Sequence, residues 1–215
     1  MDILLLTDQP DQSVLLADFA EEDGHRVHRA ALEAVDMDQR VGDVEAVWLA
    51  GNCSLTQLQQ DGSLERLSRF MKEQVAGRGI GYLGQGVGLG LLIEALGGQF
   101  DPTEESDLLF QRIQLTEEGA TGVLMDGIPE LFDAPVCRAG QTVRMPEHAV
   151  CLATSEEIPV QAVRWELRAY ATQFLLETAL SNGELAIGSD GFSATAYEAI
   201  CERIYINWLQ MMART

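Results

Sequence analysis

The chain has 215 residues, a length that suits one domain with a single well-filled core. Its formal net charge is −20 and its only lysine is Lys72, so its electrostatic field repels nucleic-acid phosphates and anionic membranes. No apolar run is long enough to span a bilayer, and acid stands near the start where a signal peptide carries base. We therefore expect one domain, 1–215, that is soluble and cytoplasmic, with a solvated acidic surface and neither a nucleic-acid nor a membrane partner.

The first part of the chain, up to Gly98, alternates apolar runs with segments of helical spacing. Most of the helical segments end at glycine, as helices commonly do. Such alternation is what a parallel sheet with right-handed crossovers requires. The pattern predicts strands at 1–7, 27–32, 46–50 and 80–83, and helices at 13–23, 63–76 and 89–96.

Beyond residue 98 the pattern changes to short strand-like runs separated by turns that contain proline. We expect these runs to extend the sheet and to add a small β element. The predicted fold class is therefore α/β, a mostly parallel open sheet flanked by helices, with a small β element in the second half. The runs are 108–115, 151–153, 160–165 and 169–174, and a final amphipathic helix spans 194–212.

The four cysteines stand far apart, and none has the CxxC spacing of a metal or redox motif. Three of them sit among apolar residues, as small core side chains do. We therefore expect no structural disulfide and no metal site, and the sequence indicates no cofactor. The cysteines are Cys53, Cys137, Cys151 and Cys201.

The segment GYLGQGVGLGLLIEALGG, residues 81–98, combines a predicted strand, a glycine-rich turn and a helix. A turn of this kind in an α/β sheet exposes one side chain at the carboxyl edge of the sheet. It also aims backbone N–H groups outward at a helix N-terminus, where they hold an anion or an oxyanion. The turn is therefore the candidate site for chemistry, and a small anion such as a carboxylate or phosphate is the ligand that it suits.

This segment resembles the nucleophile elbow of class I glutamine amidotransferases, whose pattern GxCxGxQ precedes a helix that ends in a glycine pair. The sequence EALGG at 94–98 fixes the register. Gly84 and Gly88 then fall on the flanking glycines, Gly86 on the nucleophilic cysteine and Gly90 on the following glutamine. A nucleophile at such an elbow commonly has strained backbone angles, and glycine relaxes that strain.

Four further blocks resemble the same family in the same order along the chain. The first, WLAGNCS, is similar to the strand and glycine loop that help to form the oxyanion hole. Together the blocks resemble the glutaminase domain of GMP synthase-type enzymes and imply a flavodoxin-like arrangement of one domain. The blocks are WLAGNCS at 48–54, PELFDAP at 129–135, MPEHAVCLATSEEIPVQAVRW at 145–165 and AYATQFLLE at 169–177.

From the resemblance, the candidate ligand-binding residues lie in two neighbouring loops. They would serve as backbone donors or as pocket-lining groups. They are Gly51, Asn52 and Cys53 after the third strand, and Gly84, Gln85, Gly86, Val87, Gly88 and Gly90 at the elbow.

The last block carries a second departure from the family, whose members have the motif QFHPE at this point. Leu175 replaces the histidine that takes the thiol proton, and Leu176 replaces the proline. Glu177 keeps the place of the glutamate that orients the imidazole, and we interpret it as a retained hydrogen-bonding residue. A carboxylate without its base activates no nucleophile, so Gly86, Leu175 and Glu177 are vestigial positions.

The two replacements lead us to expect no glutaminase activity. We expect instead a catalytically inactive amidotransferase-like protein, a pseudoenzyme that serves as a binding, regulatory or scaffold subunit. Active members of the family pass ammonia to a synthase, so the resemblance implies a synthase or ligase partner; a homo-oligomer is the alternative.

Two enzymatic alternatives remain open at this stage. In the first, a relocated thiol such as Cys53 serves an amidotransferase or another hydrolase, although His25, His28 and His148 fall outside the catalytic blocks and are interpreted as surface residues. In the second, GQGVGLG binds a dinucleotide, but Leu89 stands where the third glycine belongs.

Overall fold

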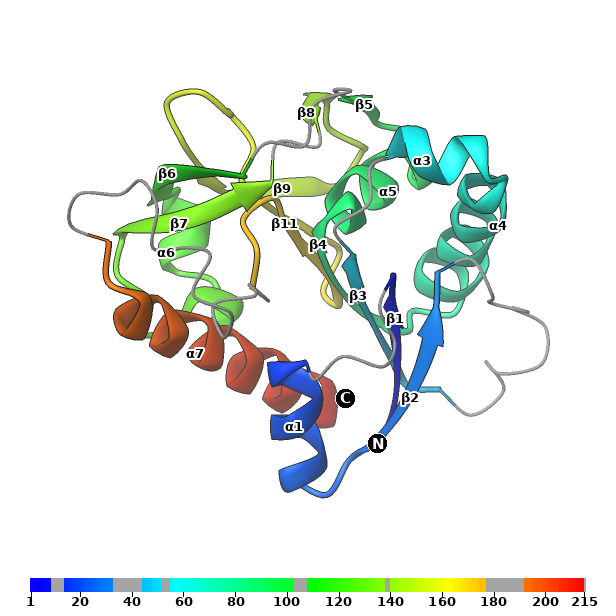
Figure 1. Ribbon diagram of the computed structural model, residues 1–215, viewed down its shortest axis with the longest axis horizontal. Coiled ribbons are helices and arrows are strands. Elements are labelled where there is room, and N and C mark those ends of the chain that lie inside the picture. Colours follow the sequence, from blue (N-terminus) through cyan, green and yellow to red (C-terminus); the bar gives the residue numbers. More distant parts are fainter. Residues whose placement is uncertain are drawn as a thin grey trace.

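The computed structural model describes residues 1–8, 14–32, 44–51, 55–102, 108–137, 140–176 and 192–214. Its centre is one nine-stranded sheet with helices on both faces (Figure 1). The strand order is β2-β1-β3-β4-β11-β10-β9-β6-β7. The predicted α/β class is therefore confirmed.

The first five strands in this order pair in parallel. The four inner strands are mostly buried because a parallel sheet is covered on both faces, whereas the edge strand is exposed to half-buried. All six residues of β4 are buried, glycines included. The bounds of the five are β2 (Arg26–Ala31), β1 (Asp2–Thr7), β3 (Ala46–Gly51), β4 (Gly81–Gly86) and β11 (Ala169–Thr172).

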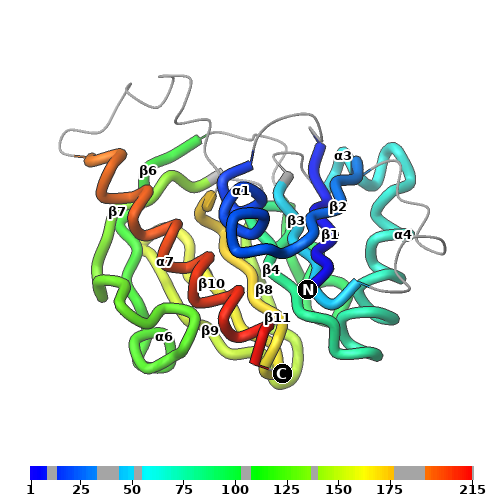
Figure 2. Tube along the Cα trace, turned by 90° about the horizontal axis from the view of Figure 1, so that it is seen from below, coloured from blue at the N-terminus to red at the C-terminus, as the bar shows by residue number. Residues whose placement is uncertain are grey.

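Successive side chains of these strands enter different cores, as the period of two requires. On β1, Ile3 and Leu5 pack in the core that contains residues of α1 and α7, whereas Leu4 and Leu6 pack in the core of α4 and α5. Figure 2 shows α1 and α7 together on their face of the sheet. The helices are α1 (Leu15–Glu22) and α7 (Ala194–Ala213) on that face, and α3 (Leu55–Gln60), α4 (Ser63–Phe70), the π-helical η1 (Met71–Gly77) and α5 (Val87–Ala95) on the other.

The remaining four strands extend the sheet by antiparallel pairing, as predicted for the second half. The block PELFDAP contributes most of the last strand, where Pro135 is tolerated because an edge strand needs fewer ladder donors. A short helix and a 3₁₀ turn connect the two outer strands. The elements are β10 (Ala162–Trp165), β9 (Ala149–Thr154), β6 (Leu108–Leu115), α6 (Glu117–Ala120), η2 (Val123–Met125) and β7 (Leu131–Cys137).

The small β element is present, but its strands differ from the four runs that the sequence pattern offered. Those runs all lie in the main sheet, and the separate ribbon pairs β5 (Gln99–Pro102) with β8 (Gly140–Arg144). Most of the ribbon's side chains are exposed or half-buried, with Phe100 as the exception. The hydrophobic alternation that marks a strand in sequence is therefore nearly absent.

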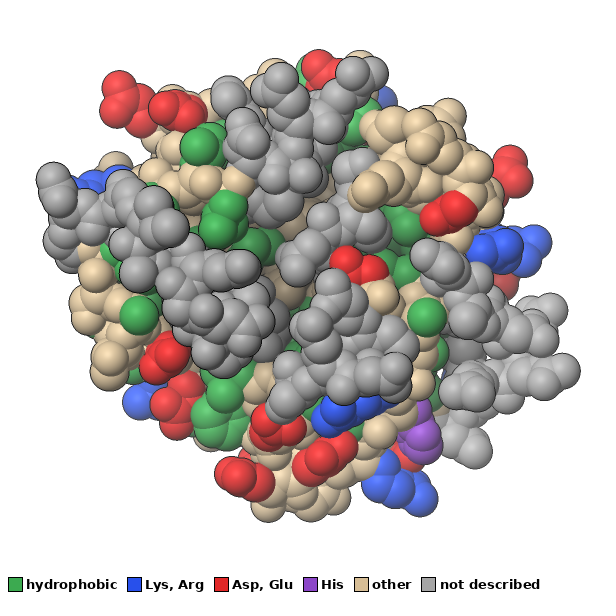
Figure 3. Space-filling view, in the orientation of Figure 1, with side chains coloured by type: hydrophobic (Ala, Val, Ile, Leu, Met, Phe, Trp, Pro, Cys, Tyr) green, Lys and Arg blue, Asp and Glu red, His purple; other side chains and the backbone are tan. Residues whose placement is uncertain are grey.

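The three histidines are predicted to lie at the surface, and two of them are exposed. His28 and His148 are exposed, and each lies beside an acid, Asp2 and Glu147 respectively; His25 is half-buried next to the N-terminal amine. Acidic side chains stand at several separate places on the face in Figure 3. The part of the chain that the structure describes contains no helix long and apolar enough to cross a membrane.

Candidate functional site

The candidate site lies at the carboxyl edge of the parallel strands, where β3, β4 and β11 end side by side. Gly51 pairs with Gly86 in the β3–β4 register, and Gln85 pairs with Thr172 in the β4–β11 register. The structure therefore brings Gly51, the elbow and the segment after Thr172 to one place, as the resemblance implied. Asn52, Cys53 and Glu177 lie outside the described residues.

Gly86 forms a sharp elbow between strand and helix. β4 ends at this residue and α5 begins at the next, Val87. The backbone of Gly86 has φ 54° and ψ −112°, a region that side chains with a Cβ rarely adopt. The predicted strained elbow is therefore present, with glycine at the strained position.

The other elbow glycines are required by close packing. A Cβ at Gly84 would lie 2.4 Å from the Tyr82 hydroxyl, and one at Gly90 would lie 2.9 Å from a Leu55 methyl and 3.0 Å from the Phe100 ring. The Tyr82 hydroxyl donates to the Gly88 carbonyl at 2.9 Å, which fixes the first turn of α5 on its strand. Binding of a ligand by these residues remains a prediction, since packing alone accounts for the glycines.

Gln85 uses its side chain to hold the segment after β11. Its Oε1 accepts a hydrogen bond from the Leu176 backbone N–H at 2.6 Å, and Gln85 is only 2% exposed. The side-chain amide thereby satisfies the buried Leu176 N–H, which is not paired in a strand ladder. The sequence indicates Gln85 as a candidate ligand group and carries no local signal for this contact.

Leu175 is fixed through both of its backbone polar groups. Its N–H donates to the Pro135 carbonyl at 2.9 Å, and its carbonyl accepts from the Tyr197 hydroxyl at 2.7 Å. The residue is 6% exposed. The position that the resemblance assigns to a catalytic histidine thus holds a buried isobutyl group in a fully bonded backbone.

The tyrosines around the elbow have no acid–base role near neutral pH. Burial raises the pKa of Tyr82 and raises that of Tyr197 well above its usual range. Both hydroxyls therefore stay protonated and act as hydrogen-bond donors. The sequence placed Tyr197 on the apolar face of the last helix but gave no signal that its hydroxyl reaches the site.

The two cysteines with described side chains are not nucleophiles at this site. Cys201 is buried in α7, and Cys151 is half-buried in β9, where its thiol donates to the Ala153 carbonyl. Burial raises the pKa of Cys151, which is opposite to the shift that a reactive thiol needs. Within the described ranges no cluster of side chains suits a metal ion. The relocated-thiol hypothesis for Cys53 stays a prediction.

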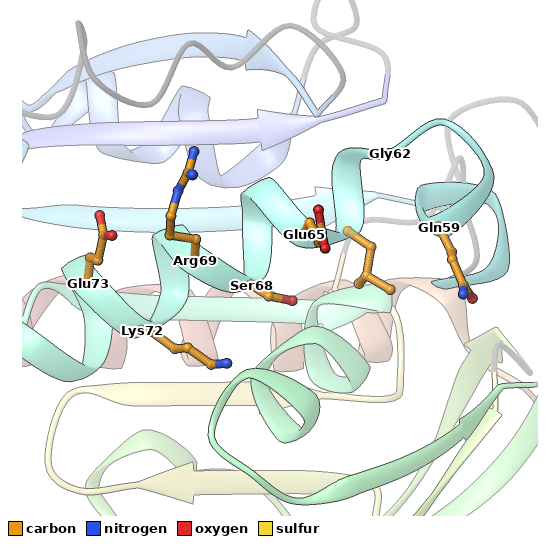
Figure 4. Close-up of a pocket in the computed structure, with 8 residues that line it drawn as sticks. Gln59, Gly62, Glu65, Ser68, Arg69, Lys72 and Glu73 are labelled. Carbon is orange, nitrogen blue, oxygen red and sulfur yellow. The ribbon is translucent and has the colours of Figure 1, made fainter.

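Two open pockets among the described residues lie away from the elbow. One of about 730 Å³ borders α3, α4 and η1, and its lining combines the cations Arg69 and Lys72 with the anions Glu65 and Glu73 (Figure 4). The opposed charges indicate no particular charged ligand. A second pocket, of about 360 Å³, includes Trp165 at the end of β10 and Leu167 of the β10–β11 turn.

Comparison with known proteins agrees with this architecture. A glutamine amidotransferase from Thermotoga maritima superposes with a TM-score of 0.78 at 12% identity, over 99% of this chain and 98% of that one. One from Methylobacillus flagellatus gives 0.73 at 14% identity, over 97% and 94%. A GMP synthase-type subunit from Thermoplasma acidophilum gives 0.72 at 14% identity, over 100% and 95%.

This chain has the class I glutamine amidotransferase fold. The likeness extends over essentially the whole chain and thus includes both the parallel half and the antiparallel extension. At these identities the comparison shows the fold alone. No protein-family model and no curated protein matches the sequence.

The backbone at Gly86 yields a first prediction. We expect Gly86→Ala to lower the free energy of unfolding by about 3 kcal/mol, since the added Cβ must occupy the strained region. Gly62→Ala is the control: Gly62 has φ 76° and ψ 8°, and its Cβ would meet nothing within 4 Å. It should cost about 1 kcal/mol. Equal losses in urea denaturation would contradict a strained elbow.

A second prediction concerns the bond that holds Leu175. Tyr197→Phe leaves the buried Leu175 carbonyl without its donor and should cost about 1–3 kcal/mol. Tyr170→Phe is a matched control, because that hydroxyl has only long contacts, at 3.4 Å to the Leu167 carbonyl and 3.6 Å to the Met211 sulfur. We expect under about 0.5 kcal/mol there. Urea denaturation midpoints give the loss of unfolding free energy for both variants. Equal losses would contradict the view that the Tyr197 hydroxyl stabilises the Leu175 backbone.

Proposed function

We propose that this chain is a non-catalytic glutamine amidotransferase-like protein that serves as a binding or regulatory subunit of a synthase-type partner. The observation that carries the proposal is Leu175, a buried apolar residue bonded through its backbone at the position of the expected base. The fold supports the amidotransferase-like part of the statement. The loss of activity is our inference.

Glutamine hydrolysis by this fold requires a thiol that forms a thioester and a base that accepts the thiol proton. Gly86 has no side chain to form the covalent bond, and the isobutyl group of Leu175 accepts no proton. Instead, the backbone N–H of Leu176 donates a hydrogen bond to the side-chain amide oxygen of Gln85, and this bond links the elbow to the segment after β11. This arrangement favours a role of the sheet edge in stability over the activation of a nucleophile.

A glutaminase assay coupled to ammonia detection tests the proposal. We expect turnover below about 10⁻³ s⁻¹, against the about 1–10³ s⁻¹ common for enzymes. Cys53→Ala should leave the background unchanged. Turnover that Cys53→Ala abolishes would instead support the relocated thiol, and turnover that survives it would require a nucleophile that we have not identified.

The double variant Gly86→Cys with Leu175→His asks whether the site is otherwise intact. We expect no rescue above about tenfold over background, because the new imidazole would lie in an apolar setting that disfavours its charged form. The new cysteine would also carry the strain of the elbow. Rescue to an ordinary enzymatic rate would mean that the surrounding pocket is still catalytic, and our proposal would fail.

The partner is expected at the carboxyl edge, where active relatives would release ammonia. The GMP synthase-type protein from Thermoplasma acidophilum is, by its description as a subunit, one part of a larger enzyme. The ribbon β5–β8 borders this edge, since Gly140 at its end accepts a bond from the Gln173 side chain. Asp101, which pairs with Gln141 in that ribbon, is exposed there.

Affinity capture with charge-reversal variants tests this placement. Asp101→Arg should reduce the recovery of a stoichiometric synthase or ligase about tenfold, a loss of about 1.4 kcal/mol in binding. Glu73→Arg, an equal charge change on η1, should leave recovery unchanged. If both variants retain the partner equally, the carboxyl edge is not the docking surface.

A further inference from the structure

The turn between β10 and β11 presents two exposed residues and a half-buried arginine at the opposite edge of the sheet from the elbow. The turn leads directly into Ala169, which pairs with Tyr82 near the start of β4, so it lies at the amino edge of the parallel strands. These three residues are the tripeptide Glu166-Leu167-Arg168. Leu167 is 75% exposed, more than any other large apolar side chain in the described ranges.

The backbone of this turn is held in a conformation that L-residues rarely adopt. Glu166 has φ 53°, and it is one of two non-glycine residues with positive φ in the described part of the chain. Such angles persist only where the surroundings enforce them. The neighbouring Trp165 is fixed by a hydrogen bond from its indole N–H to the Glu147 carbonyl at 3.0 Å. The outward position of Leu167 is therefore set by the fold.

A mostly apolar pocket lies directly beside this exposed leucine. Its volume is about 360 Å³, and its lining includes Val75 of η1, Ile80 before β4 and Trp165 at the end of β10. The tripeptide Glu166-Leu167-Arg168 forms another part of its wall, so Leu167 projects from the pocket's own border. Burying a leucine side chain in such a pocket is favourable because it removes apolar surface from water. A projecting leucine and a hollow of this kind form complementary shapes on one surface.

Arg168 adds an unsatisfied charge at the rim of the pocket. Its Nε is buried and makes no hydrogen bond within the described residues, and its Nη2 meets only the Met212 sulfur at 3.7 Å. Sulfur is a weak acceptor, whereas guanidinium groups prefer carboxylates. Arg168 is half-buried, so a carboxylate from outside the chain would bind its outer nitrogens and not the enclosed Nε.

We propose that this surface binds a second copy of the same chain in a two-fold symmetric dimer. When the tripeptides of two copies lie antiparallel about a two-fold axis, the acid of each copy stands opposite the base of the other. Glu166 of each copy then faces Arg168 of the other and supplies the missing carboxylate. Each Leu167 enters the pocket of the other copy against Val75, Ile80 and Trp165.

Charge explains why this patch is used for self-association in a chain of net charge −20. Two copies repel each other over long range, so a dimer needs a surface where opposite charges pair and apolar area is buried. The tripeptide offers one positive and one negative group per copy. The dimer leaves the carboxyl edge free, so it does not depend on whether the elbow is catalytic or which synthase binds there.

Sedimentation velocity on charge-swapped variants tests the proposal. The wild-type chain should form a dimer between about 1 and 100 µM. Glu166→Arg and Arg168→Glu should each weaken the dimer at least about tenfold, because each places like charges together twice. A one-to-one mixture of the two variants should restore a heterodimer, since every cross-pair is then opposite in charge.

Control variants distinguish a loss of the dimer interface from a loss of folding. Glu130→Arg makes the same charge change as Glu166→Arg at an exposed acid before β7, the far edge strand of the sheet, and should leave the dimer intact. Leu167→Ser should weaken dimerisation without altering thermal stability. Should Arg168→Glu fold poorly, Arg168→Gln tests the same contact without repulsion.

The outcomes are decisive in either direction. A wild-type chain that is monomeric at about 100 µM overturns the proposal and assigns the patch to a different protein. Folded single variants that still form dimers overturn it as well. So does a mixture that stays monomeric although both variants show wild-type melting curves.

Discussion

The structure depends on one constraint, the reversal of the chain at Gly86 between a fully buried strand and a largely buried helix. No loop residue separates β4 from α5, so the change of direction falls on one set of backbone angles. Only glycine adopts φ 54° with ψ −112° at low cost. The Tyr82 side chain then crowds a Cβ at Gly84, and the Leu55 and Phe100 side chains crowd one at Gly90. The glycine-rich sequence of the elbow thus has a structural origin whether or not a ligand binds there.

The elbow also determines how the next part of the site is built. Because β4 ends at the carboxyl edge, Gln85 is placed to bond the Leu176 N–H, and Tyr197 reaches Leu175 from the last helix. Four elements, β4, β7, α7 and the segment after β11, meet there through hydrogen bonds to buried backbone groups. Such a network rigidifies the edge, since each broken bond would leave a buried polar group unsatisfied. Rigidity of this kind is compatible with the docking role that we propose for this edge.

The two edges of the parallel sheet carry different properties. The carboxyl edge has the elbow, a strained glycine and satisfied backbone groups. The amino edge has the strained residue Glu166, an exposed leucine and a guanidinium nitrogen without an acceptor in the described part of the chain. Strain persists where packing enforces it, and at the amino edge it displays Leu167 outward. We therefore propose partner binding at the first edge and self-association at the second.

The sequence by itself determined the alternation of strands and helices, the position of the elbow and the glycine at its strained point, because hydrophobic period and glycine placement are local signals. It missed the ribbon β5–β8, whose strands are short and largely exposed. Only the tertiary structure decided that Gln85 and Tyr197 fix the segment around Leu175, and that Arg168 lies beside an apolar pocket. Those contacts join residues that are 91 and 22 positions apart in the first two cases. No local pattern encodes such pairs, because they exist only once the sheet brings the strand ends together.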